Sequence, residues 1–432
     1  NSNKPYQFDG WSTAAEGGSA VNVNQPFMQD TTVYAHWTLL GVDYEINGKT
    51  LHFYGSGSMP DTAYGSTAPW ANAANVAGVT SVVIDEGILN VGNYAFSDIS
   101  TLTSASIPGS VKTIGDSAFA ECRGLTSLTI PEGVATIGAG AFSSCTNLTN
   151  VKLPNTITSI GQQAFLGCVK LTSMEIPSGV KKIGMATFSG CSALASVTLP
   201  EGITDIGNTA FGRCTSLKTI QLPITLVSID YAFVNSGLTS VTLPEGLTSM
   251  KQAFGACPNL TNVTIPKNVQ NMEDAFQTCP NLETVVIEEG VKEIGSGAFY
   301  ECGKLTNVTI PASVTTIGTS AFGHCTSLVS IQLPAGLTTI GPNAFISCTA
   351  LTKLAIPDQV ATFDVGVVRG CTSLARILLP TNITFADANA FSDCPPLHIY
   401  YRGTQTQWEA KDPKPSPTGA SYTYDYPGTT LS

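Results

Sequence analysis

The stretch that decides the fold is LTSLTIPEGVATIGAGAFSSCTN, which runs from Leu125 to Asn147. The next stretch of the same length, from Leu148 to Lys170, reads LTNVKLPNTITSIGQQAFLGCVK and keeps nearly every apolar position. Self-similarity at a fixed period of about 20–50 residues is typical of stacked repeat architectures. In these architectures each unit contacts its neighbours along one axis. We therefore expect an array of stacked coils.

Fourteen copies of this unit occupy residues 79–396. With the first Leu counted as position 1, apolar residues recur at positions 1, 4, 6, 10, 13, 17, 18 and 21. Apolar positions 4 and 6 alternate with polar positions 3 and 5, which predicts a half-buried β-strand. Pro at position 7 of twelve copies ends that strand because it cannot donate to a ladder. Gly at position 14 predicts a turn with positive φ. The copies begin at Val79, Leu102, Leu125, Leu148, Leu171, Leu194, Leu217, Leu238, Leu260, Leu282, Leu305, Leu328, Leu351 and Leu374.

The whole pattern, L-x-x-[VL]-x-[IL]-P-x-x-[VI]-x-x-I-G-x-x-A-F-x-x-C, resembles the BspA-type leucine-rich repeat, also called the treponemal class. The resemblance implies a β-rich repeat solenoid of about 14 copies of about 23 residues each, with a parallel sheet on one face and turns or short helical segments on the other. It also implies a bacterial surface protein, because some members of this class bind host matrix proteins or other bacteria.

Residues 1–38 precede the array and have a different pattern, with expected strands at Ala20–Val23 and Thr32–Trp37. They resemble the Listeria–Bacteroides repeat, a small β-rich module of bacterial surface proteins. The usual first strand of that module is missing from the match, so we expect a truncated copy. The matching residues are Phe8, Gly10, Trp11, Gly17, Gly18, Asp30, Val33, Tyr34, Ala35 and Trp37.

Residues 39–78 carry a hairpin signal, since Tyr44–Ile46 and Thr50–Tyr54 flank the turn pair Asn47-Gly48. The first coil of a solenoid would otherwise expose its apolar interior, so we expect these residues to form an N-terminal β cap. After residue 396 the repeat phase ends, and residues 397–432 are expected to form a short C-terminal cap and a linker-like tail that begins at Lys411. Residues Tyr422–Tyr426 in this tail have the alternation of a last strand.

Composition excludes several classes of function. The net charge of −11 argues against a nucleic-acid partner, which would need a basic surface. No apolar run approaches the roughly 18–20 residues needed to span a bilayer. The four histidines are scattered, and the sequence has no nucleophile elbow or phosphate-binding loop. We expect no catalytic residue, cofactor or metal.

All twelve cysteines occupy position 21 of the repeat, and the other two copies carry Ile99 and Ser236 there. Side chains stacked about 4.8 Å apart point in parallel, whereas a disulfide needs Cβ atoms roughly 3.5–4.5 Å apart that face each other. We expect buried, reduced thiols that act as small hydrophobic residues.

The copies that begin at Leu217, Leu238 and Leu260 are shorter than all the others, as the spacing of the starting residues shows. Residues other than glycine replace their position-14 Gly. The missing residues fall on the turn side, so we expect a local change of curvature. Tolerated deletion without a functional role is the simpler interpretation.

The exposed strand face, made by positions 3 and 5, is the expected binding surface. Its neighbourhood around Lys152 and Glu175 is the first choice because the charge varies there. A solvated Thr/Ser surface without a binding role is the competing interpretation, since the face has few of the aromatic and Arg anchors found in interface hot spots. The candidate residues are Ser127, Thr129, Asn150, Lys152, Ser173, Glu175, Ser196, Thr198, Thr219 and Gln221.

We expect a non-enzymatic, extracellular cell-surface adhesion protein, a monomer that binds a protein of the host matrix or of a bacterial surface. Two alternatives stay open: a carbohydrate-binding surface protein, and a targeting module of a larger enzyme. The chain begins at Asn1 without Met or a signal peptide, so we expect an exported protein whose signal peptide and anchor lie outside this sequence.

Overall fold

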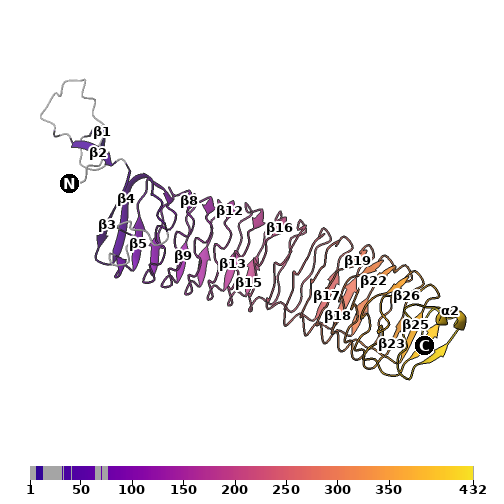
Figure 1. Ribbon diagram of the computed structural model, residues 1–432. Coiled ribbons are helices and arrows are strands. Elements are labelled where there is room, and N and C mark those ends of the chain that lie inside the picture. The colour runs from indigo at the N-terminus through magenta and orange to yellow at the C-terminus, as the bar shows by residue number, and fades with distance from the viewer. Residues whose placement is uncertain are drawn as a thin grey trace. The chain divides into compact units, whose positions relative to one another are not determined.

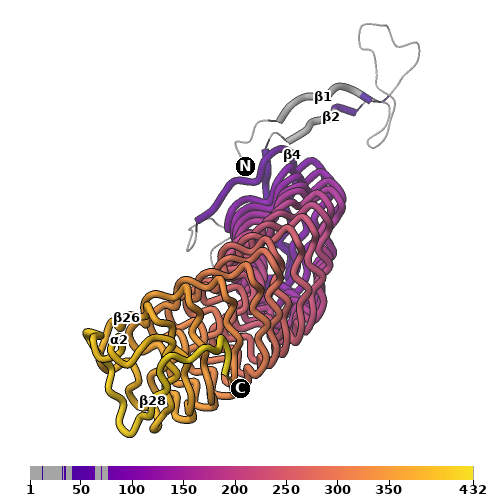
Figure 2. The backbone as a smooth tube through the Cα atoms, turned by 90° about the vertical axis from the view of Figure 1, so that its right-hand side faces the viewer, coloured from indigo at the N-terminus to yellow at the C-terminus, as the bar shows by residue number. Residues whose placement is uncertain are grey.

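The computed structural model describes residues 6–12, 32, 34–39, 41–63, 70 and 76–431. The chain divides into two compact units, residues 1–171 and residues 172–432. Within each unit, every copy of the repeat makes one coil, and successive coils follow the same outline (Figures 1 and 2). The predicted solenoid is therefore confirmed.

Positions 3–5 of most coils form a short strand, and these strands pair in parallel along what we call the first ladder (Figure 1). Thr129 pairs with Lys152 in the first unit, and Glu175 pairs with Thr198 in the second. The residue between the two exposed ones points inward, as the alternation predicts. The strands are β5 (Ser81–Ile84), β7 (Ser104–Ser106), β9 (Ser127–Thr129), β11 (Asn150–Lys152), β13 (Ser173–Glu175), β15 (Ser196–Thr198), β17 (Asn262–Ile265), β18 (Thr284–Ile287), β20 (Asn307–Thr309), β23 (Lys353–Ala355), β25 (Arg376–Leu379) and β27 (His398–Tyr401).

A second parallel ladder, made mostly by positions 12 and 13, adds to the single sheet face that the pattern implies. Its strands are very short in most coils, and their second residue is a buried Ile or Phe. A strand of two residues is too short to show the alternation of apolar and polar residues, so the sequence pattern did not reveal this ladder. The strands are β6 (Ile88–Val91), β8 (Thr113–Ile114), β10 (Thr136–Ile137), β12 (Ser159–Ile160), β14 (Lys182–Ile183), β16 (Asp205–Ile206), β19 (Glu293–Ile294), β21 (Thr316–Ile317), β22 (Thr339–Ile340), β24 (Thr362–Phe363) and β26 (Thr384–Phe385).

The core of each unit is a column of phenylalanines from position 18. In the second unit the rings of Phe276, Phe299 and Phe322 stack nearly parallel, with centroids 5.6 and 5.4 Å apart. These side chains are fully buried, together with the position-1 Leu and the position-17 Ala of their coils. Inter-coil backbone bonds, such as Phe299 N to Ala321 O at 2.8 Å, hold the column in register.

The position-14 glycines do not adopt positive φ, so that prediction was wrong. The left-handed residues of the turn side, which we define as positions 15–20, lie at positions 16 and 20, as in Ser117 (φ 51°) and Glu121 (φ 60°). Where glycine occupies position 14, the preceding coil approaches it closely. A Cβ added to Gly138 would lie 2.6 Å from the backbone nitrogen of Asp116.

The expected hairpin is confirmed: β3 (Gly41–Asn47) pairs with β4 (Thr50–Ser58) in an antiparallel register that brings Asn47 opposite Thr50. Strand β4 also pairs in parallel with β5 and β6, one strand of each ladder. Leu51 and Phe53 are buried, and the ring of Phe53 lies 5.5 Å from that of Phe96. The hairpin thus occupies the place of a coil before the first repeat, as a cap would.

Residues 1–38 contribute one antiparallel pair, β1 (Tyr6–Ser12) with β2 (Tyr34–Leu39), whose register is interrupted between Phe8 and Gly10. Strand β2 corresponds to the strand expected at Thr32–Trp37. The strand expected at Ala20–Val23 lies outside the described residues. The truncated module stays a prediction.

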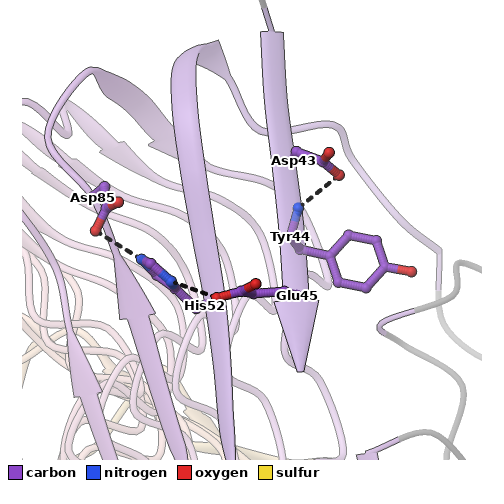
Figure 3. A network of polar contacts seen from close by, with 5 residues as sticks. All are labelled: Asp43, Tyr44, Glu45, His52 and Asp85. Atoms are coloured by element: carbon purple, nitrogen blue, oxygen red, sulfur yellow. Dashed lines mark hydrogen bonds and ion pairs between the residues drawn. The ribbon is translucent and has the colours of Figure 1, made fainter. Parts of the chain in front are cut away.

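His52 joins three strands of the hairpin region (Figure 3). Its Nε2 lies 2.9 Å from Asp85 Oδ1, just after β5, and its Nδ1 lies 3.4 Å from Glu45 Oε1 on β3. The hydrogen bond with Asp85 raises the pKa of His52 above 6.5, Glu45 raises it further, and partial burial opposes both. Protonated His52 therefore ties the hairpin to the first coil.

This network predicts a pH-dependent stability. Because the folded-state pKa of His52 is above 6.5, its contribution is fully present below about pH 6.5 and is lost as the pH rises through that raised value. The effect is at most about 1 kcal/mol for a partly exposed pair. We expect urea unfolding at several pH values to show that the free energy of unfolding of wild type exceeds that of His52→Gln at low pH, and that this difference shrinks as the pH rises. A constant difference would contradict this role.

The tail is packed on the last coils, which contradicts the expectation of a linker from Lys411. Strand β28 (Ser421–Thr423) pairs in parallel with β27, after the short helix α2 (Gln405–Glu409). The last strand expected at Tyr422–Tyr426 is thus confirmed in part. Farther along, Lys353 donates to the carbonyl of Leu431 at 3.1 Å and Arg402 donates to that of Gly428 at 3.0 Å. Tyrosines and main-chain bonds therefore hold a segment whose composition resembles a linker.

The first two of the three short copies, which begin at Leu217 and Leu238, form no strand of the first ladder, whereas the third contributes β17. The second ladder continues through all three. Residues 219–221 and 240–242 form no strand, whereas bridges run from Asp205 through Ser228 and Ser249 to Asn271. At position 14, Asp230 accepts hydrogen bonds from Ser249 Oγ (2.7 Å) and Lys251 N (2.8 Å). Loss of the strand does not follow copy length strictly, because the full-length copy that begins at Leu328 has only an isolated bridge at Ser330. The expected change of curvature stays a prediction.

Candidate interaction surface

The cysteines form a ladder of buried thiols that bridge neighbouring coils. Cys302 Sγ donates to the carbonyl of Phe276 at 3.2 Å, and Cys325 donates to that of Phe299 at 3.2 Å. All twelve cysteines are free, and only Cys394 is more than marginally exposed. Burial raises the pKa of Cys145, Cys214, Cys302 and Cys348 to about 12. The expected burial of the thiols is confirmed for eleven of the twelve cysteines, and the structure adds the hydrogen bond to the preceding coil. Their reduced state stays a prediction.

These thiols should be nearly inert until the protein unfolds, because the thiolate is the reacting form and their raised pKa suppresses it at neutral pH. Titration with an aromatic disulfide reagent should count twelve thiols in denaturant without reductant. In the native protein Cys394 should react first because it is the most exposed thiol, although burial raises its pKa to about 11 and slows it too. Several fast native thiols, or far fewer than twelve after denaturation, would contradict the arrangement.

Histidine and acidic side chains form no cluster that could bind a metal ion in the part of the chain that the structure describes. No group of three or more His, Cys, Asp or Glu side chains there could hold a metal ion. His398 contacts the hydroxyls of Ser421 and Thr423 at 2.7 and 2.8 Å, and the ring of His324 packs edge-on against Tyr300. The surface of the first ladder is therefore the main candidate.

The structure places all ten candidate residues on the exposed surface. In the first unit, Ser127 and Thr129 on β9 lie beside Asn150 and Lys152 on β11. In the second, β13 and β15 bring Ser173 and Glu175 beside Ser196 and Thr198. Thr219 and Gln221 are exposed too, but on a coil that forms no strand.

Many hydroxyls elsewhere in the repeat hold the coils together. At position 2, Thr149 Oγ1 donates to the carbonyl of Thr126 at 2.9 Å. At position 9, Thr156 Oγ1 donates to the carbonyl of Val134 at 2.7 Å and accepts from Gly133 N at 3.2 Å. Each hydroxyl thus satisfies main-chain groups of the preceding coil.

The hydroxyls among the ten candidate residues at positions 3 and 5 make no such bonds, although Ser81 at position 3 of the first copy does bond Thr50 at 2.8 Å. Within the described ranges, the side chains of the ten candidate residues make no hydrogen bond or ion pair with the rest of the chain. The repeat therefore separates its polar side chains into a set that binds neighbouring coils and a set that is available to a partner.

Two features of this face were not expected from the residue types. Val286 on β18 is 37% exposed between Thr264 on β17 and Thr309 on β20, so it offers an apolar anchor within a row of hydroxyls. Leu378 at position 5 is fully buried, in the region where the tail bonds to Lys353. Val286 could have been singled out in the sequence as the apolar residue between two threonines, whereas the burial of Leu378 depends on the packed tail.

Comparison with known proteins agrees with this architecture. The family model of the BspA-type leucine-rich repeat region matches residues 73–195, 181–304 and 292–409. No curated protein sequence matches the chain. None of the helices in the described segments is long and apolar enough to cross a membrane.

Solved structures match the chain at low sequence identity, and two of the following three share the fold with a TM-score of 0.50 or more. A leucine-rich repeat protein from Bacteroides ovatus is 24% identical, with a TM-score of 0.55 over 89% of this chain and 98% of that one. The pneumococcal vaccine antigen PcpA is 18% identical, with a TM-score of 0.50 over 89% of this chain and 97% of that one. A leucine-rich cell surface protein from Faecalibacterium prausnitzii is 24% identical, with a TM-score of 0.40 over 87% and 96%. Since the family model covers most of the chain, the protein belongs to the BspA-type leucine-rich repeat family.

Proposed function

We propose that this protein is an extracellular, cell-surface interaction protein that binds a protein partner through the exposed face of the first ladder. It acts as a monomer, without catalysis or a cofactor, and its partner is a protein of the host matrix or of another bacterial surface. The observation that carries the proposal is that the ten exposed candidate side chains at positions 3 and 5 make no hydrogen bond or ion pair within the described part of the chain.

Two further observations support a protein partner. The backbone of the face is pre-formed, because main-chain ladders and buried residues fix it, so binding does not have to order the main chain. It also combines hydroxyls with charged and apolar residues: Lys152 lies beside Thr129 in the first unit, and Val286 lies between Thr264 and Thr309 in the second. An apolar centre with a polar rim is the usual arrangement of a protein interface.

The buried thiols support a role without nucleophilic catalysis. Each thiol for which a bond is described donates to a backbone carbonyl, as Cys302 does to Phe276. Burial raises the pKa of Cys302 to about 12, so the thiolate is scarce at neutral pH.

The proposal is tested with the full chain and purified host matrix and bacterial surface proteins in a surface-binding assay. One variant carries Ser127→Arg and Thr129→Arg on the first unit, and another carries Thr264→Arg and Val286→Arg on the second. The matched control places arginine on the turn side, as Ser143→Arg with Gln163→Arg. We expect at least one face variant to weaken binding tenfold or more, as loss of a hot spot does, while the control binds normally. The face is rejected as the binding site if both face variants bind as tightly as wild type, or if only the control variant loses binding.

A further inference from the structure

A shallow polar depression of about 370 Å³ lies on the turn side of the second unit, away from the first ladder. It centres on Gly297, the position-16 residue of its coil. Six side chains from three successive coils line it: Asp274, Gln277, Ser296, Tyr300, Thr319 and Ser320.

The depression exists because a glycine interrupts a row of larger residues. Asp274 and Ser320 occupy position 16 in the coils on either side of Gly297, and all three have φ between 52° and 62°. A Cβ added to Gly297 would lie 2.0 Å from Asp274 Oδ1. The missing side chain therefore leaves the space into which the Asp274 carboxylate leans.

The walls of the depression are held in place by neighbouring coils. Asp274 N donates to Ser296 O and Gly297 N donates to Thr319 O, both at 2.8 Å. The ring of Tyr300 packs against Gly323, where an added Cβ would lie 3.0 Å from ring carbon Cδ2, and His324 covers it edge-on with centroids 5.2 Å apart. The aromatic wall is thus pre-oriented.

The polar groups of the lining are available to a ligand. In the described part of the chain none of the six side chains makes a hydrogen bond or an ion pair with another residue. Partial burial, with a smaller effect from the charge of Glu273, raises the pKa of Asp274, and the charge of Lys251 opposes both. The carboxylate is therefore partly withdrawn from water while it lacks a hydrogen-bond partner.

We propose that this depression binds a neutral carbohydrate ring. The lining offers one carboxylate, one carboxamide and four hydroxyl groups, a mixture of acceptors and donors that matches adjacent hydroxyls of a sugar. The Tyr300 ring supplies an apolar surface for the C–H face of the ring, with its polar tip at the edge. The single negative charge of Asp274 disfavours uronic, sialic and sulfated sugars. A bound cation would need more acceptors, and Gln277 and the hydroxyls also donate.

The site is independent of the proposed protein-binding face, because its residues come from positions 15, 16 and 19 rather than 3 and 5. The two proposals can therefore fail separately.

The test uses the full chain and saturation-transfer difference NMR with the methyl glycosides of glucose, galactose, mannose and N-acetylglucosamine. Asp274→Ala removes the carboxylate and Tyr300→Ala removes the aromatic wall. Gln163→Ala and Leu166→Ala alter the same two repeat positions in the coil that begins at Leu148. Asp274→Asn keeps the shape of the side chain if the alanine variant does not fold.

We expect at least one glycoside to bind with millimolar affinity, and each change at Asp274 or Tyr300 to weaken it about tenfold or more. The control variants should bind as wild type does. The proposal is overturned if none of the four glycosides binds, or if binding survives both Asp274→Ala and Tyr300→Ala. Binding of the amine N-acetyl-lysine methylamide in place of the sugars would instead identify a cation site and would also overturn it.

Discussion

Replacing Phe299 with alanine is expected to lower the free energy of unfolding of the second unit by about 3–5 kcal/mol. The ring stacks on Phe276 and Phe322, its centroid lies 5.6 and 5.4 Å from theirs, and the side chain is fully buried. Its removal leaves a cavity in a column that inter-coil backbone bonds hold rigidly, so the neighbouring coils cannot collapse into it.

The matched change Phe299→Leu keeps most of the volume and should cost about 1.5 kcal/mol or less. Urea unfolding followed by circular dichroism measures both variants. Long repeat arrays can unfold in parts, so hydrogen exchange of the amides near Phe276 and Phe322 is measured as well. It should also show a larger loss of stability for the alanine variant than for the leucine variant. Equal losses for alanine and leucine would show that the stacked column does not control stability.

Replacing Gly318 with alanine is expected to destabilise the second unit by roughly 1–3 kcal/mol or more, although alanine favours ordered structure over glycine. A Cβ at this position would lie 2.5 Å from Ser296 N and 2.9 Å from Gly295 C, both in the preceding coil. Gly318 N also donates to Ile294 O at 2.8 Å, so the coils cannot separate without losing a ladder bond.

Gly303 is the matched control, because an added Cβ there meets nothing nearer than Thr326 Oγ1 at 3.5 Å. Gly303→Ala should be neutral or stabilising by up to about 1 kcal/mol, through the unfolded state. Thermal unfolding of the two variants distinguishes a clash between neighbouring coils, expected only for Gly318→Ala, from a destabilisation caused by replacing any glycine with alanine. A stable Gly318→Ala protein would contradict the explanation for glycine at position 14.

The sequence predicted those features that one coil can display. Alternation around Leu128 predicts a half-buried strand, and the apolar character of the Phe142 and Cys145 positions predicts a buried core and buried thiols. The stacking of the rings into a column was not predicted. The Asn47-Gly48 turn of the hairpin was likewise predicted from its own residues.

Features that depend on two coils were missed or misread. Gly138 was assigned positive φ, yet the reason for glycine there is the backbone of Asp116 in the preceding coil. The packed tail depends on bonds from Lys353 and Arg402 that no local pattern reveals. The depression at Gly297 likewise needs the carboxylate of Asp274 from the preceding coil and the Tyr300 ring as its wall.

The sequence predicted that the candidate face is exposed, but not which of its hydroxyls stabilise the fold and which are available to a partner. The repeat pattern identifies Ser127 and Thr129 as outward-facing, and the structure confirms it. Only the structure separates these hydroxyls from that of Thr149, which is also exposed but bonds the preceding coil. This separation depends on inter-coil geometry.

The central claim is that the repeat divides its exposed hydroxyls into stabilising and available ones. Its most direct test compares Thr149→Val with Thr129→Val in the first unit by urea unfolding, because the two changes remove the same hydroxyl and keep the same shape. Loss of the Thr149 hydrogen bond, 2.9 Å to Thr126 O, should cost about 1 kcal/mol, while Thr129→Val should leave stability unchanged. Equal losses in the two variants would contradict the division, and with it the assignment of the Thr129 row to partner binding.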